Sequence, residues 1–196
     1  MKPLHLGLGC ALTALAAWWL FSAEPADGKA HKLTTISPRK FADSLHAVIA
    51  ADRAAYARLV ERLAFEDRRI EVSQDWQARE CLPTHAQLLR EAATRIQQRG
   101  AEFSYTLRSL WPINPSHGPQ TEVEQAGLEA LARNSDTNVY TEELLGGRSY
   151  FTAIYPDRAS LASCADCHNR HPDSPRRDFR PGEVMGALVI RVPLEF

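Results

Sequence analysis

The segment from Ser163 to Gly186 reads SCADCHNRHPDSPRRDFRPGEVMG and contains the pattern C-x-x-C-H at Cys164, Cys167 and His168. This pattern constrains the fold more than any other feature, because two thiols and an imidazole must reach one bound group. Two intervening residues let the thiols form thioethers with two vinyl groups of a porphyrin, and the histidine that follows can then ligate the iron. The pattern therefore favours covalent attachment of one c-type haem, with His168 as the proximal iron ligand.

Two other interpretations of these cysteines are weaker. A redox-active dithiol usually lies at the start of a helix after a strand, whereas the two prolines in NRHPDSPRRD lead us to expect a loop here. A structural zinc site needs four ligands, and His168 directly follows Cys167, which would strain a tetrahedral site. Thiols outside the cytosol tend to oxidise, and thioether formation removes that problem.

Three arginines follow the cysteines closely. A haem carries two propionates, and guanidinium groups pair with carboxylates through two parallel hydrogen bonds. Arg176, Arg177 and Arg180 are near enough in sequence to fold back over one haem edge. We interpret them as possible propionate partners, and the alternative is that they are solvated loop charges.

An apolar stretch of 20 residues runs from Leu4 to Ala23. It is long enough to span a bilayer. A cleaved signal peptide is the alternative, but cleavage after Ala23 would leave Phe21 where a small residue is required. We expect residues 1–23 to be a signal anchor or signal peptide and residues 24–37 to be a linker. The localisation that follows is periplasmic, with anchoring to the inner membrane by residues 4–23.

Charge and cysteine content exclude two classes of protein. The chain has 23 basic and 24 acidic residues and lacks a long basic run, so nucleic acid is not an expected partner. Only four cysteines occur in 196 residues, which excludes a disulfide-dense scaffold.

Helical patterns come first along the remaining chain. Ser37 precedes Pro38 as an N-cap followed by proline in the first turn, and apolar residues at helical spacing predict one long helix to about Ile70. A second helix is predicted from Thr84 to about Gln98. Its end is marked by a glycine two residues later.

Strand patterns dominate the second half. EFSYTLRSLWPIN alternates apolar and polar residues, NVYTEELLGGRSYFTAIYP predicts a hairpin around Gly146-Gly147, and EVMGALVIRVPLEF predicts a final strand. A capping box formed by Thr121 and Glu124 predicts a short helix before the hairpin. Helices followed by about four antiparallel strands predict an α+β fold with a PAS-like antiparallel sheet over residues 38–196.

The chain resembles a known family in four stretches that occur in the same order and spacing. They are WPINPSHGPQTEVEQAGLEAL, YTEELLGGRSYFTAIYPD, CADCHNRHPDSP and DFRPGEVMGALVIRVPL. The family is the exported c-type haem domain with a PAS-like fold, catalogued as a domain of unknown function and typified by a cyanobacterial haem protein proposed to sense redox state. The resemblance covers roughly residues 38–196.

The resemblance also bears on the second axial position of the iron. In the cyanobacterial relative a cysteine from the segment between the first helices and the first strand holds that position. Here the corresponding RECLPTHAQLLREA offers Cys81 and His85. Cys81, His85 and an open position all stay possible at this stage.

Two functions are compatible with these features. The resemblance favours a periplasmic, membrane-anchored haem-based sensor of redox state or of a small gas ligand. The alternative is a c-type cytochrome that carries electrons to a redox partner protein in a respiratory chain. Peroxidase-like catalysis would need an acid–base pair over open iron, which only His85 could supply, so we do not expect an enzyme.

Overall fold

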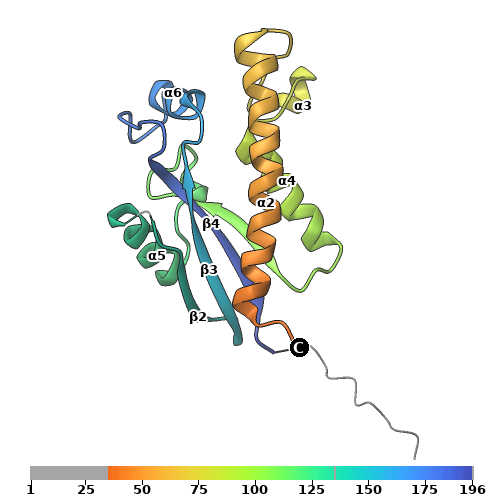
Figure 1. The fold of residues 1–196 in the computed structure, drawn as a ribbon, viewed down its shortest axis with the longest axis vertical. Helices are drawn as coiled ribbons and strands as arrows, with labels where there is room; N and C mark the ends of the chain where they lie inside the picture. Colours follow the sequence, from red (N-terminus) through yellow and green to blue (C-terminus); the bar gives the residue numbers. More distant parts are fainter. Residues whose placement is uncertain (1–34, 135, 196) are drawn as a thin grey trace, which may run out of the picture. The chain divides into compact units, whose positions relative to one another are not determined.

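The computed structural model describes residues 35–134 and 136–195 of the chain. Its strands are β1 (Ser104–Arg108), β2 (Val139–Leu145), β3 (Arg148–Arg158) and β4 (Val184–Pro193). Its helical segments are α2 (Pro38–Val60), η1 (Glu61–Glu66), α3 (Trp76–Arg79), α4 (His85–Gln98), η2 (Pro115–His117), α5 (Glu122–Arg133) and α6 (Ala162–Arg170). The strands form one antiparallel sheet in the order β1-β4-β3-β2 (Figure 1). The expected α+β class with about four antiparallel strands is confirmed.

The sheet is covered by helices on both faces. Alternate side chains of a strand point to opposite faces, and in β4 Leu188 and Ile190 pack into a core with α2 and α4. Ala187 and Val189, on the other face of the same strand, pack with α5. Figure 1 shows α2 and α5 on different sides of the sheet. The near-continuous apolar run of β4 is therefore explained by burial on both faces.

The first long helix begins as predicted and ends earlier than predicted. The side chain of Ser37 accepts a hydrogen bond of 3.2 Å from the backbone of Lys40, and Pro38 occupies the first turn. The α-helix ends at Val60 and continues as the π-helix η1 to Glu66, not to Ile70. Arg68 then adopts a left-handed backbone with φ 53°, which ends the helical path.

The hairpin between β2 and β3 forms where the glycine pair predicted it. Gly146 and Gly147 have φ of 60° and 81°, which suits a tight two-residue turn that connects twisted strands. The helix before the hairpin, α5, starts after Thr121, whose side chain accepts from the backbone of Glu124. The carboxylate of Glu124 does not complete the predicted capping box with Thr121. It binds the backbone N–H of Gln120 at 2.6 Å and two arginines of the sheet.

The predictions for the N-terminus fall outside the described residues. These are the apolar anchor or signal peptide over residues 1–23 and all but the last three residues of the linker 24–37. Among the helices within residues 35–134 and 136–195, none has the length and apolar character needed to cross a membrane.

Candidate functional site

The cysteine motif lies on a helix. α6 has nine residues and carries Cys164, Cys167 and His168, so the prediction of a loop around the cysteines is wrong. The prolines do not prevent the helix because the first of them, Pro172, follows its last residue, Arg170. Cys164 is half-buried, Cys167 is exposed, and both are free thiols. Residues three apart on a helix share one side, so both thiols are available to one planar group.

An apolar wall supports α6 at the end of the sheet. Phe179 and Met185 pack with Ala165 of α6 and with Trp111 into a separate small core. The ring of Phe179 lies edge-on to the His168 imidazole, with 6.0 Å between ring centroids. Sequence reasoning did not single out Trp111 and Phe179 because nothing in their local pattern distinguishes an aromatic wall from ordinary core.

His168 is held as a neutral imidazole. Burial lowers its pKa, although the nearby carboxylate of Asp157 acts in the opposite direction. Its Nδ1 is buried and has no hydrogen-bond partner within the described residues. A neutral imidazole is the form that ligates a metal, so the chemistry of this side chain fits the predicted role as an iron ligand.

An ion pair links the helix α2 to the strand that leads into α6. The guanidinium of Arg53 binds both carboxylate oxygens of Asp157, and the Nη2–Oδ2 distance is 3.0 Å. Asp157 lies on β3 where the register with β4 shifts, next to the turn that starts α6. Burial acts to lower the pKa of Arg53, but Asp157 and the sulfur of Cys164 hold it above its usual value. The pair therefore lies within electrostatic reach of the cysteine motif.

A second contact joins α6 to the end of the long helix. The hydroxyl of Ser163, the residue before Cys164, donates a hydrogen bond to the carboxylate of Glu61 at the start of η1. Sequence reasoning missed Ser163, Glu61 and the Arg53 pair because each contact joins residues about 100 positions apart, and a single sequence carries no signal for such pairs.

The two candidates for the second axial position lie at the start of α4. His85 is the first residue of the helix, and its ring lies edge-on to that of Tyr56, with 5.6 Å between centroids. Burial lowers the pKa of His85, the charge of Arg53 lowers it further, and a hydrogen bond with the Ala57 backbone opposes both. The sulfur of Cys81 lies 3.9 Å from the Leu82 carbonyl oxygen.

The three arginines after the motif have partners in their own loop. Arg176 lies over the rings of Trp111 and Phe179, at 4.7 and 4.4 Å from their centroids. It also forms ion pairs with Asp178 and Glu183. These contacts order the loop against the apolar wall, and a role toward propionates stays a prediction for Arg176.

Arg177 and Arg180 differ from Arg176 in their surroundings. The Arg177 guanidinium donates to the carbonyl of Pro172 at 2.7 Å. Arg180 is exposed, and its backbone N–H donates to Glu183 at 3.2 Å. A propionate role for these two side chains also stays a prediction.

The zinc interpretation finds no support in the geometry. Within residues 35–134 and 136–195, no three side chains of histidine, cysteine, aspartate or glutamate gather in an arrangement that could hold a metal ion. His171 instead lies 3.0 Å from the Gln74 side chain.

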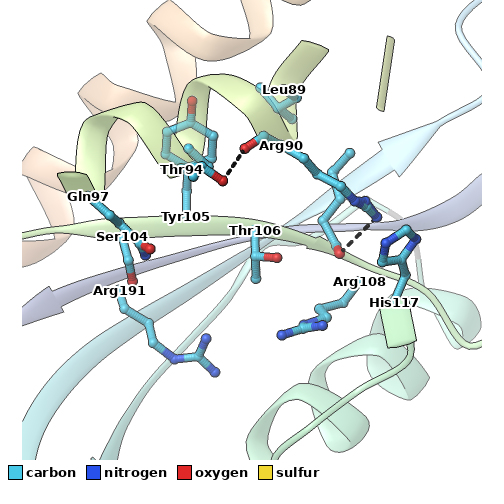
Figure 2. A pocket seen from close by; sticks show the side chains of 12 residues that line it. Leu89, Arg90, Thr94, Gln97, Ser104, Tyr105, Thr106, Arg108, His117 and Arg191 are labelled. Atoms are coloured by element: carbon cyan, nitrogen blue, oxygen red, sulfur yellow. Dashed lines mark hydrogen bonds between the residues drawn. The ribbon is translucent and has the colours of Figure 1, made fainter. Parts of the chain in front are cut away.

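A separate cavity of about 360 Å³ lies between α4 and β1 (Figure 2). Arg90, Arg108 and Arg191 line it, but Arg108 pairs with the buried carboxylate of Glu124, and Arg191 pairs with Glu124 and Glu143. Arg90 reaches the carbonyl oxygen of Leu107 at 3.4 Å. No residue of α6 lines this cavity, so it is distinct from the site of the cysteine motif.

Comparisons with known proteins identify a matching family and a similar fold. The model of the Tll0287-like family matches residues 31–193. Among solved structures, the crystal structure of the cyanobacterial heme-protein Tll0287 is similar, with a TM-score of 0.53 and 17% sequence identity. The similarity covers 82% of this chain and 98% of that chain, and at this identity it shows the shared fold. No curated protein matches the sequence.

Proposed function

Because the chain belongs to the Tll0287-like family, we propose that it is an exported protein with one covalent c-type haem that acts as a haem-based sensor. The thiols of Cys164 and Cys167 hold the haem, and His168 ligates its iron. The matched cyanobacterial protein is itself described as a heme-protein, which supports a haem in this chain as well. The proposal includes a PAS-like sheet domain and, from the apolar residues 4–23, attachment to the inner membrane on the periplasmic side.

The residues of α6 suit this chemistry. Each thiol would add across one vinyl group, forming one S–C bond while the thiol proton goes to the neighbouring vinyl carbon. Burial lowers the pKa of the half-buried His168, so its imidazole is neutral and would offer a lone pair to the iron. When bound, the haem supplies a centre that accepts one electron or a small axial ligand.

The main support for the sensor proposal comes from two polar contacts. They join α2 and η1 to the segment that contains the cysteine motif, residues 157–170. Arg53 pairs with Asp157 before α6, and Glu61 binds Ser163 within it. A change of one charge at the iron alters the field at both contacts, and α2 leads directly from the N-terminal segment. This path would convert a change at the haem into a shift of the long helix.

The attachment of haem is tested by the mass of the full chain produced in a host that matures c-type cytochromes. The unfolded protein should keep the mass of one haem and its red colour after acid–acetone extraction. Cys164→Ala and Cys167→Ala together should lose both. Bare polypeptide from the unchanged sequence would contradict the proposal.

The sensor role is tested by hydrogen exchange in α2 and η1 of the oxidised and the reduced protein. We expect exchange near Glu61 to differ between the two states and the difference to shrink in Ser163→Ala, which keeps both cysteines. A pure electron carrier predicts equal exchange in both states, so that result would favour a respiratory carrier instead.

A further inference from the structure

One buried nitrogen near the motif has no partner. His85 Nε2 is inaccessible to solvent and makes no hydrogen bond within the described part of the chain. Buried polar atoms in folded proteins are nearly always satisfied, and an exception needs a specific reason such as a missing ion or ligand. The inference below rests on the proposed function, because it assigns this nitrogen to the haem of that proposal.

The position of His85 is fixed by the start of α4. Thr84 and Gln87 form a complete capping box, which sets where α4 begins and so where its first residue lies. The Tyr56 ring lies edge-on to the imidazole and packs against it. Burial lowers the pKa of His85, which favours the neutral imidazole that ligates a metal.

His85 and His168 belong to one electrostatic neighbourhood although they come from α4 and α6. The charge of Asp157 acts on both imidazoles, and its partner Arg53 also acts on His85. Glu61 acts on His85 and also accepts a hydrogen bond from Ser163, the residue directly before Cys164. Both imidazoles are therefore within electrostatic reach of Asp157, whose partner Arg53 lies on α2.

Cys81 shares Tyr56 with His85 as a neighbour, but its other interactions differ. Its sulfur contacts the carbonyl of the following residue, Leu82, and its charge acts on the hydroxyl of Tyr56. That hydroxyl is bound to the carbonyl of Pro83 at 2.7 Å. These groups belong to the connection before α4, whereas the groups around His85 include both members of the Arg53–Asp157 pair.

We propose that His85 Nε2, and not the sulfur of Cys81, is the second axial ligand of the haem iron, opposite His168. The centre is then six-coordinate with two imidazoles. The sensor then responds to reduction or oxidation of the iron, and a gas can bind the iron only by displacing His85. This departs from the cysteine ligand that the resemblance implied for the second position.

The test uses the full chain with its matured haem, in four forms: the unchanged protein, His85→Ala, Cys81→Ala and, as a matched control, His117→Ala on η2. Electron paramagnetic resonance of the ferric protein should show a low-spin centre of the bis-imidazole type. His85→Ala should lose this signal, become high-spin and bind carbon monoxide when reduced. Added imidazole should restore the low-spin signal, while Cys81→Ala and His117→Ala should match the unchanged protein.

Several outcomes would overturn the inference. A thiolate-type signal in the unchanged protein that disappears in Cys81→Ala would assign the position to the cysteine. A high-spin unchanged protein that binds carbon monoxide would show an open position. The spectrum of the unchanged protein decides between these cases even if His85→Ala does not fold. Mass spectrometry of each form keeps the two proposals apart, because haem mass with the wrong spectrum refutes this ligand alone, whereas missing haem mass refutes the proposed function.

Discussion

Replacing Asp157 by asparagine should weaken the fold at the junction between α2 and the motif segment. The carboxylate of Asp157 has 16% of its side-chain surface exposed and the guanidinium of Arg53 has 29%. Asparagine keeps the size and one acceptor oxygen but removes the charge, so Arg53 stays partly buried without a counter-charge. Removing one partner of a fully buried pair costs about 3–5 kcal/mol. Because Arg53 keeps some contact with water, we expect about 2–3 kcal/mol.

The assay is urea unfolding of the haem-loaded chain, followed by far-ultraviolet circular dichroism. With a slope of about 2 kcal/mol per M, the midpoint should fall by roughly 1 M while the slope stays unchanged. The control is Glu91→Gln, which removes an exposed i,i+4 pair with Arg95 on α4. That change should cost only about 0.3–0.5 kcal/mol.

A double-mutant cycle tests the physical reason. Arg53→Gln combined with Asp157→Asn leaves no unpaired charge, so the double variant should be less destabilised than the sum of the two single changes. Strict additivity, or a loss in Asp157→Asn no larger than that in Glu91→Gln, would refute the reasoning. Either result would also remove the main support for coupling between α2 and the motif.

Three further changes test other parts of the structure. Glu124→Gln should destabilise the protein by about 3 kcal/mol in the same urea assay, because the fully buried carboxylate pairs with two arginines of the sheet. Gly127→Ala should lower the unfolding midpoint and leave haem attachment unchanged, since an added Cβ would overlap Cδ1 of Ile154 and force this fully buried side chain to repack. Burial acts to raise the pKa of Asp43, but hydrogen bonds from Tyr155 and a second tyrosine hold it below its ordinary value. Its ionised form therefore stabilises the fold above about pH 4 and loses that effect as the pH falls through the lowered pKa, so the stability difference from Asp43→Asn should shrink in acid.

Local sequence rules were sufficient for the elements whose cause is local. Ser37 and Pro38 set the start of α2, Thr84 sets the start of α4, and the glycine pair 146–147 sets the hairpin, because caps and turns depend on residues within one turn of chain. The strands of the antiparallel sheet were also predictable from local patterns. Alternation of apolar and polar residues, or a long apolar run as in β4, indicates a strand and shows which of its faces are buried.

The helical form of the motif segment shows where local reasoning failed. The prolines after the cysteines argue against a long helix and favour a loop, yet they only limit the helix to the nine residues of α6. The π-helix η1 at the end of the long helix was also missed. Its first residue, Glu61, contacts Ser163 about 100 positions away, and a helix pattern in the sequence does not report such a contact.

What the sequence determined by itself is the C-x-x-C-H motif, which places two thiols and an imidazole within five consecutive residues and predicts the chemistry of attachment. What only the tertiary structure decided is which groups surround that motif. Arg53, Asp157 and His85 come from three elements that are distant in the chain, and the packing of α2 and α4 on one sheet face brings them together. The spacing of the two cysteines and the histidine is encoded locally, whereas the approach of Arg53, Asp157 and His85 to one another depends on how the whole chain folds.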